Sequence, residues 1–594
     1  MYHFPQRFVS GLLLLCVTSA SQGAPTIEEE LAALADKCQQ LGMAEQAVLT
    51  RDWWIHRDPH RQYLFLPPEI DPLKPLPDAP VLTRQWYTRF RQVRADEADR
   101  LFELAKQQLS DGRGAKAYQL LHEVLHQDPD HADARRALGY ALVNHRWRLP
   151  ETEIVVKKSS LPHPTLQFPP GFWRVSSEHF EITTNVSAQQ GRQLAVDLEE
   201  LHGIWRQLFF EYWSSNTSLK HWFHSGARRG RSARKHKVVL FRNRQEYVSN
   251  LESSEPRIAI TTGYYLAQKQ TSYFYVAESL AMSTCWHEVT HQLFQETGRP
   301  AIRIGERGNA WVIEGIALFM ESLRRHDGFY SVGGLDAKRL QYARFNVLNG
   351  NSYVPLNDFV KIDRRQLQQD PRIRQLYSQA AGLTHFLMHR ESDLVDYVKL
   401  VYAGRDTSAS LAATTKTPLE ELDRQYRQFL DVTDADLAHF EAPELLQDLS
   451  LGRTSVTASG LKVLAGNEQL RWLNLSFTGA TDQTVQLIEG SRQLRELNLE
   501  QTMVTDACMN SIGHFRELQE LDLSGTSITD HGLSHLTNLA NLKILWLTNC
   551  PVTDDGLRYL SGLKQLEYVN LSGSQVTAAG WERLKQQLPN LQSD

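Results

Sequence analysis

The chain has 594 residues, more than one hydrophobic core accommodates, and its length predicts three or four domains. Hydrophobic residues make up 41% and charged residues 22% of the sequence, which is typical of globular proteins and excludes a disordered chain. The 64 basic and 69 acidic residues nearly balance, so the charge gives no reason to expect nucleic acid or an anionic membrane as the main partner.

The first 24 residues have the organisation of a secretory signal peptide. Arg7 supplies a positive charge, residues 8–17 form an apolar run, and small residues follow up to Ala24. The run is shorter than the roughly 20 residues that cross a bilayer, and no other stretch reaches that length. We therefore expect a protein that is exported to the periplasm or the extracellular space and has no membrane span.

A helical module is predicted after the signal. Leu104-Ala105 recurs 34 residues later as Leu138-Gly139, and residues 96–147 resemble one full tetratricopeptide repeat followed by the first helix of another. The resemblance implies a peptide-binding groove. The alternative is a spacer that docks on a neighbouring domain, because one repeat cannot bury its apolar face alone.

A small sheet is predicted next. The proline-rich residues 150–170 are interpreted as a linker, and residues 189–210 as an amphipathic helix. Strands are predicted at residues 172–175, 179–184, 237–241, 261–265 and 271–276.

The motif His287-Glu288-Val289-Thr290-His291 lies in an apolar stretch that predicts a buried helix. Two histidines four residues apart lie on one face of a helix, so both imidazoles can bind one metal ion. Glu288 lies about 100° further round, close enough to reach a water molecule at the metal. The motif predicts one Zn²⁺ per chain. The alternative is a solvated helix face.

A second apolar helix is predicted from Trp311, with Glu314 near its start and Glu321 at its end. Catalytic zinc takes three protein ligands and keeps one open position, and Glu314 follows His291 by 23 residues. The pattern W-x-x-E-G-x-A-x-x-x-E after HExxH resembles the gluzincin metallopeptidases, the superfamily of thermolysin, especially their peptidase-MA-like branch. The resemblance implies a thermolysin-like catalytic domain in which Glu314 is the third zinc ligand and Glu321 supports the site.

Two further residues are candidates for stabilising an oxyanion. Tyr377 and His385 lie in one predicted helix, and the resemblance to metallopeptidases implies a Tyr or His in this role. An ordinary core tyrosine explains Tyr377 equally well. The Gly-x-Met-Glu-Asn segment of the aminopeptidase branch is absent at residues 262–265, which favours an endopeptidase.

The C-terminal part repeats with a period of 24 residues. It resembles the short bacterial form of the leucine-rich repeat and predicts a solenoid with one strand and one short helix per unit. The outward strand positions suit a protein or glycan partner on the concave face. A merely solvated face is the alternative. The six units open at Leu446, Leu470, Leu494, Leu518, Leu542 and Leu566.

The sequence thus predicts a multidomain α+β protein. Its parts are a signal peptide (1–24), a helical-repeat module (25–150), a gluzincin-like metallopeptidase domain with a small sheet, HExxH helix and helical lobe (151–435), and an α/β leucine-rich-repeat solenoid (436–594). We expect an exported zinc endopeptidase that acts on peptides or proteins. The alternatives are a catalytically silent scaffold that binds proteins through its repeats, and a zinc enzyme that cleaves another bond.

Overall fold

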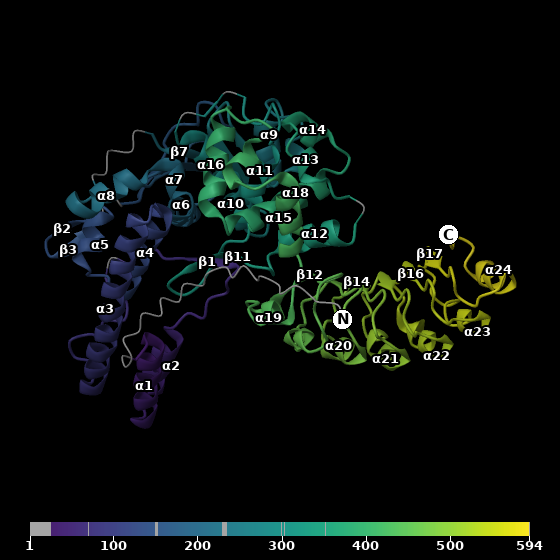
Figure 1. The fold of residues 1–594 in the computed structure, drawn as a ribbon. Helices are drawn as coiled ribbons and strands as arrows, with labels where there is room; N and C mark the ends of the chain where they lie inside the picture. Colours follow the sequence, from purple (N-terminus) through teal and green to yellow (C-terminus); the bar gives the residue numbers. More distant parts are fainter. Residues whose placement is uncertain are drawn as a thin grey trace.

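The computed structural model describes residues 25–68, 70–148, 153–227, 234–298, 300–301, 303–350 and 352–592, so the predicted signal peptide lies outside the described residues. Helices and several sheets build a multidomain α+β protein (Figure 1). Its regions are an N-terminal helical module, a central region with a mixed sheet, and a C-terminal array of parallel strands. No described helix is long and apolar enough to cross a membrane.

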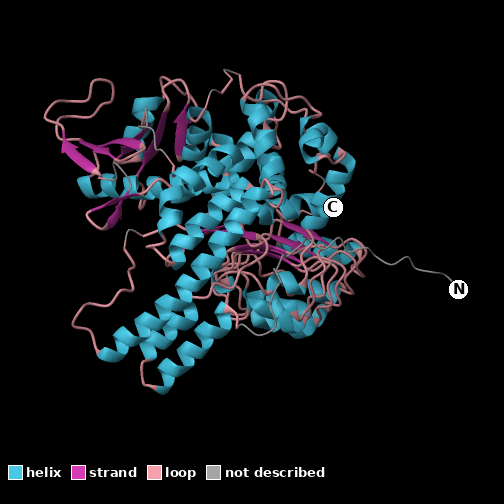
Figure 2. Cartoon of the chain, turned by 60° about the vertical axis from the view of Figure 1, so that its left-hand side comes forward, coloured by secondary structure: helices cyan, strands magenta, loops and turns pink. Residues whose placement is uncertain are grey.

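In the N-terminal module, helices α3 and α4 pack side by side around a shared apolar core. The predicted opening helix of a second repeat is short, because α5 ends before Gly139, whose φ of 85° is left-handed, and a hairpin of β2 and β3 follows. Figure 2 shows the long helices of this module projecting from the central body. The elements are α1 (Ile27–Gln40), α2 (Ala44–Asp52), β1 (Arg61–Leu64), α3 (Val81–Ser110), α4 (Gly114–Gln127), α5 (Ala132–Ala137), β2 (Ala141–Val143) and β3 (Arg146–Arg148).

The central region is built on a six-stranded sheet in the order β4-β5-β6-β7-β9-β8. Strands β6, β7 and β9 are parallel neighbours, whereas β8 runs antiparallel to β9 at one edge. Part of the predicted linker is instead an edge strand, because β4 pairs with β5. The strands are β4 (Val155–Lys158), β5 (Trp173–Ser176), β6 (Phe180–Thr184), β7 (His236–Phe241), β8 (Gly263–Leu266) and β9 (Thr271–Tyr275).

Helices cover this sheet and continue into a helical lobe. Strand β1 of the N-terminal module pairs with β11 here, which ties the two regions together. The first elements are α6 (Ala188–Leu208), α7 (Phe210–Trp213), α8 (Asn216–Ser225), α9 (Arg244–Leu251), α10 (Met282–Glu296), α11 (Trp311–Met320), β10 (Arg324–Arg325) and β11 (Tyr330–Gly333). The lobe adds α12 (Lys338–Leu348), α13 (Leu356–Phe359), α14 (Arg364–Gln369), α15 (Ile373–Met388), α16 (Glu391–Tyr402), α17 (Ser410–Thr415), α18 (Leu419–Phe429) and α19 (Asp434–Leu437).

The C-terminal array contains one short strand every 24 residues, and the strands pair in parallel in chain order. The unit-opening leucines are buried, so each repeat stacks its apolar face on its neighbours. The strands are β12 (Asp448–Ser450), β13 (Trp472–Asn474), β14 (Glu496–Asn498), β15 (Glu520–Asp522), β16 (Ile544–Trp546) and β17 (Tyr568–Asn570), and the helices are α20 (Asp482–Leu487), α21 (Met509–Ile512), α22 (Asp530–Leu533), α23 (Asp554–Leu557) and α24 (Ala578–Gln587).

The array is joined to the central region through helix α12. The ring of Trp472 on β13 stacks on Tyr342 of α12, with 5.1 Å between the ring centroids. The buried Arg344 donates to the backbone carbonyls of Leu430 and Ser450. The array therefore shares a continuous core with the helical lobe.

Candidate metal centre

Helix α10 carries the HExxH motif between the core and a pocket. Its apolar face buries Cys285, Val289 and Leu293, which is why the helix forms and docks here. It lies close to β8, because a Cβ on Gly263 would meet the side chain of Thr284 at 2.6 Å. The other face carries the motif's charged and imidazole side chains into a pocket of about 390 Å³.

Helix α11 brings Glu314 to the same pocket. Nearly all of its side chains are buried, so it crosses the interior with Glu314 in its first turn. The neighbouring Gly315 allows α15 to approach closely, since a Cβ there would lie 2.7 Å from the carbonyl oxygen of Ala380. The Glu-Gly pair therefore combines an inward carboxylate with close helix packing.

Three side chains converge in the pocket. The Nε2 atoms of His287 and His291 lie 3.2 Å apart, and they lie 3.6 and 3.7 Å from Oε2 of Glu314. Zinc binds nitrogen and oxygen at about 2.0–2.2 Å, so donor atoms around a tetrahedral ion lie about 3.3 Å from one another. The three donors fit a zinc ion without a change in the backbone.

The charges in the pocket also suit a cation. Burial by itself lowers the pKa of His287, but hydrogen bonding to Glu314 and Glu321 outweighs it and raises the pKa to about 10. Burial by itself raises the pKa of Glu314, but His291 and His287 hold it well below its ordinary range. Glu314 thus keeps its negative charge next to the two histidines, which favours a cation between them.

Hydrogen bonds also hold the two carboxylates next to the three donors, those of Glu288 and Glu321, in place. Glu288 accepts a hydrogen bond of 2.8 Å from the backbone N–H of Tyr265 on β8, which holds its carboxylate at the pocket wall. Nδ1 of His287 lies 2.9 Å from Oε1 of Glu321, and Arg339 of α12 donates two hydrogen bonds to the same carboxylate. Such a partner on the second imidazole nitrogen orients a metal-binding histidine.

The two oxyanion candidates differ in position. Tyr377 lines the pocket together with Glu288 and Glu314, and burial followed by the negative charge of Glu314 raises its pKa. His385 is buried on α15 against Phe319, with ring centroids 4.8 Å apart, and is not among the described residues that line the pocket. Of the two, the structure brings only Tyr377 to the candidate metal centre.

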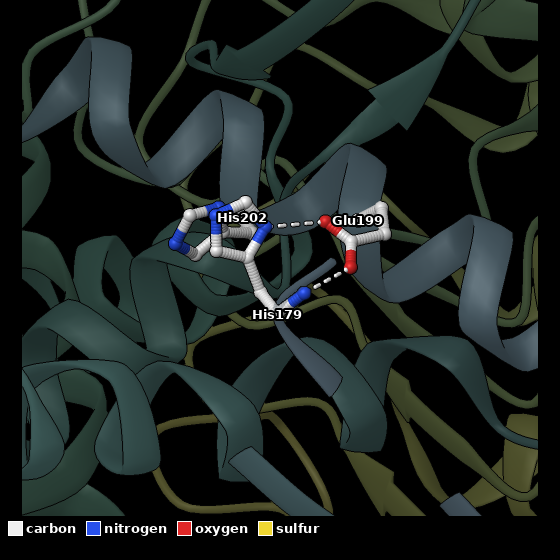
Figure 3. A group of neighbouring side chains, drawn as sticks. All are labelled: His179, Glu199 and His202. Carbon is white, nitrogen blue, oxygen red and sulfur yellow. Dashed lines mark hydrogen bonds and ion pairs between the residues drawn. The ribbon is translucent and has the colours of Figure 1, made fainter. Parts of the chain in front are cut away.

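A second group of two histidines and one glutamate lies beside another hollow. It consists of His179, Glu199 and His202 (Figure 3), and no feature of the sequence had singled it out. Oε1 of Glu199 accepts a 2.7 Å hydrogen bond from the backbone N–H of His179, and Oε2 lies 2.7 Å from Nδ1 of the same residue. Glu199 and His202 are three residues apart on α6, which was the available sequence signal.

The two groups differ in how the imidazoles face each other. Rings that share one tetrahedral zinc ion have centroids about 5 Å apart, given zinc–nitrogen distances of about 2.0–2.1 Å. The rings of His287 and His291 are 4.9 Å apart at 78°. Those of His179 and His202 are stacked 3.8 Å apart at 28°, too close to converge on one ion (Figure 3). The candidate metal centre is therefore the pocket at α10 and α11.

Sequence comparisons point to the region that holds this centre. Residues 281–404 match a family described as "Protein of unknown function (DUF1570)", and this segment contains all three converging donors. No curated protein matches the chain.

Two solved structures of internalins from Listeria monocytogenes are similar to part of the chain. One is 20% identical, covers 25% of this chain and 47% of its own, and has a TM-score of 0.20. The other, internalin C2, is 25% identical, covers 27% of this chain and 73% of its own, and has a TM-score of 0.21. This chain thus spans about half the length of the first internalin.

Proposed function

We propose that this protein is an exported zinc-dependent metallopeptidase of the gluzincin type that acts as an endopeptidase. The observation that supports this most is the convergence of His287, His291 and Glu314 at distances that suit zinc, beside the carboxylate of Glu288. The thermolysin-like assignment of the domain rests on the HExxH and Glu-Gly motifs and belongs to the same proposal.

His287, His291 and Glu314 would hold the ion, and zinc would polarise the scissile carbonyl and lower the pKa of a water molecule. Glu288 lines the same pocket and is held by the Tyr265 N–H, so its carboxylate is placed to take a proton from the attacking water. Glu288 then gives this proton to the leaving amine. Tyr377 is the candidate donor to the oxyanion.

Strand β8 is placed to hold the substrate backbone. It is the last strand in the sheet order, and its residues from Gly263 to Tyr265 line the metal pocket. An extended peptide can add to such an edge as a further strand. Among the described lining residues, the acidic ones are Glu288, Glu314 and Glu321, each with a role at the metal. None is left to bind a free N-terminus, which favours an endopeptidase.

We assign partner or substrate binding to the strand face of the C-terminal array. Its outward side chains include Glu496, Glu520 and Asp522, with Trp546 and Tyr568 further along. Burial and then the charge of Glu520 raise the pKa of Glu496, as expected for crowded carboxylates. Aromatic and acidic side chains on one face suit a protein partner.

Zinc analysis combined with an activity assay on an unstructured protein tests the proposal. Wild type should contain about one zinc per chain and cleave the substrate. Glu288→Gln should keep the zinc and lose turnover. Glu278→Gln is the control, because Glu278 is exposed just before α10 and outside the pocket.

Each other outcome has a distinct meaning. Wild type that carries no zinc after purification without chelators would refute the metallopeptidase. A zinc-loaded wild type that cleaves no peptide bond would favour the silent scaffold, or an enzyme that cleaves another bond.

A further inference from the structure

The metal pocket opens into a second, larger hollow. The hollow has a volume of about 800 Å³, against about 390 Å³ for the metal pocket. The two share part of their walls, so they adjoin and the hollow is within reach of a substrate bound in the metal pocket. The shared lining residues are Ile260, Thr261, Tyr264, Arg364, Gln368 and Tyr377.

Besides the histidines that face the carboxylates, two arginines line the metal pocket among the described residues, Arg339 and Arg364. Arg339 is already paired, because it donates two hydrogen bonds to the carboxylate of Glu321. The guanidinium of Arg364 is exposed and makes no hydrogen bond or ion pair with another described residue. Arg364 is therefore the cation that remains available to a substrate at the metal centre.

The backbone holds Arg364 firmly although its side chain is free. Arg364 is the first residue of α14, and its N–H donates to the carbonyl of Gly305 at 2.8 Å. The preceding Asp363 caps the helix by accepting from the backbone N–H of Gln366. A side chain on a fixed backbone can select a ligand at lower entropic cost than one on a mobile loop.

The hollow is lined by three arginines, and none of their guanidinium groups pairs with an acidic side chain among the described residues. Arg257 and Arg365 also line it, and the guanidinium of neither pairs with a described side chain, although the backbone N–H of Arg257 donates to Glu255. The three acids that line the hollow have other partners. Asp363 caps α14, Glu255 accepts a 3.0 Å hydrogen bond from the hydroxyl of Tyr264, and Glu306 lies 3.7 Å from the guanidinium of Arg303. The hollow thus offers three guanidinium groups that have no carboxylate partner among the described residues.

We infer that Arg364, supported by Arg257 and Arg365, binds a substrate carboxylate in this hollow and selects substrates that present one close to the cleaved bond. The carboxylate belongs to an acidic side chain or to the C-terminus of the substrate. A guanidinium recognises either one through two parallel hydrogen bonds. The inference rests on the proposed peptidase function and adds a substrate class to it.

Quenched fluorescent peptides of one parent sequence test the inference. The first set has an amidated C-terminus and places Glu at each position within three residues of the cleaved bond. The second set carries Gln there, and the third carries Gln with a free C-terminus. We expect kcat/KM for the best Glu or free-carboxylate peptide to exceed that of the neutral peptide by tenfold or more. The set that shows the preference identifies the source of the carboxylate. A preference for the free C-terminus would make the enzyme a carboxypeptidase and not an endopeptidase.

Variants of Arg364 show whether this residue makes the selection. Arg364→Gln should remove the preference, mainly through KM, and Arg364→Glu should favour a peptide that carries Lys at the selected position. Arg374→Gln is the matched control, because Arg374 is exposed on the neighbouring helix α15 and outside both hollows. Zinc content and melting temperature, measured for every variant, confirm that it is folded.

The outcomes separate this inference from the proposed function. Equal cleavage of Glu, Gln and free-carboxylate peptides by wild type would overturn the inference and leave the peptidase intact. A preference that survives in both Arg364 variants would also overturn it. A zinc-loaded protein that cleaves no peptide would overturn the proposed function and the inference together.

Discussion

Among the described residues, two groups of two histidines and one glutamate lie close enough to be considered as metal sites, and they differ in geometry rather than in composition. His287 and His291 lie one turn apart on α10, with rings 4.9 Å apart and nearly perpendicular. His179 precedes β6 and His202 lies on α6, and their rings stack 3.8 Å apart. A set of ligand types is therefore insufficient for zinc. The lone pairs must also converge on one point.

Replacing one histidine in each group gives the largest contrast. His291→Ala should reduce the zinc content from about one per chain to none and abolish peptidase activity, because transition-state stabilisation worth several kcal/mol is lost, about a thousandfold or more in rate. His202→Ala should retain the zinc. The measurements are metal analysis and kcat/KM. Loss of the zinc in His202→Ala alone would reverse the comparison.

The effect of metal removal on the melting temperature should show which of the two groups binds the metal. A ligand present at about a thousand times its Kd stabilises the folded state by about 4 kcal/mol, so chelation should lower the melting temperature of wild type. His291→Ala should already melt at the lower temperature and show no further change with chelator. Calorimetry with and without chelator measures this. An equal response in wild type and His291→Ala would place the bound metal elsewhere.

Replacing Arg339, which holds the Glu321 carboxylate against His287, should have a smaller effect on zinc binding than replacing a zinc ligand. Arg339→Gln leaves Glu321 without its two guanidinium hydrogen bonds, so the orientation of His287 is less fixed. Changes to such partners weaken metal affinity about 10- to 100-fold. Competition with a chelating dye measures the affinity. Arg325→Gln is a control, since Arg325 pairs with Glu200 away from the metal pocket.

The group of His179, Glu199 and His202 should contribute to the stability of the fold and not to zinc binding. Burial by itself raises the pKa of Glu199, but its hydrogen bonds with His179 outweigh this and hold the pKa below its ordinary 4.5. Ionised Glu199 therefore stabilises the fold above pH 4.5, and this contribution is lost as the pH falls through the lowered pKa. Glu199→Gln should cost about 1–3 kcal/mol at pH 7 and less in acid. Denaturation at several pH values measures the difference, and a constant cost would contradict the assignment.

Much of the architecture follows from local sequence periods. The spacing of 24 residues predicted the six parallel strands of the C-terminal array, because each repeat makes the same contacts with the next. The expected strands before the HExxH helix also formed, including the antiparallel pair β8 and β9. Two segments differ from the prediction. Helix α5 is shorter than expected because Gly139 adopts a left-handed conformation, and part of the predicted linker is strand β4 because it pairs with β5.

The sequence by itself determined that His287 and His291 lie on one face of a helix, with Glu288 about 100° further round, because the helical period fixes the relative positions of nearby residues. The tertiary structure decided the surroundings. Only folding brought the Tyr265 N–H to Glu288 and the Arg339 guanidinium to Glu321. It also placed Arg364, which has no described side-chain partner, beside the candidate metal centre. The same packing put His385 against Phe319 instead of in the pocket. These contacts join residues far apart in the chain, so they depend on how helices pack and not on any local spacing.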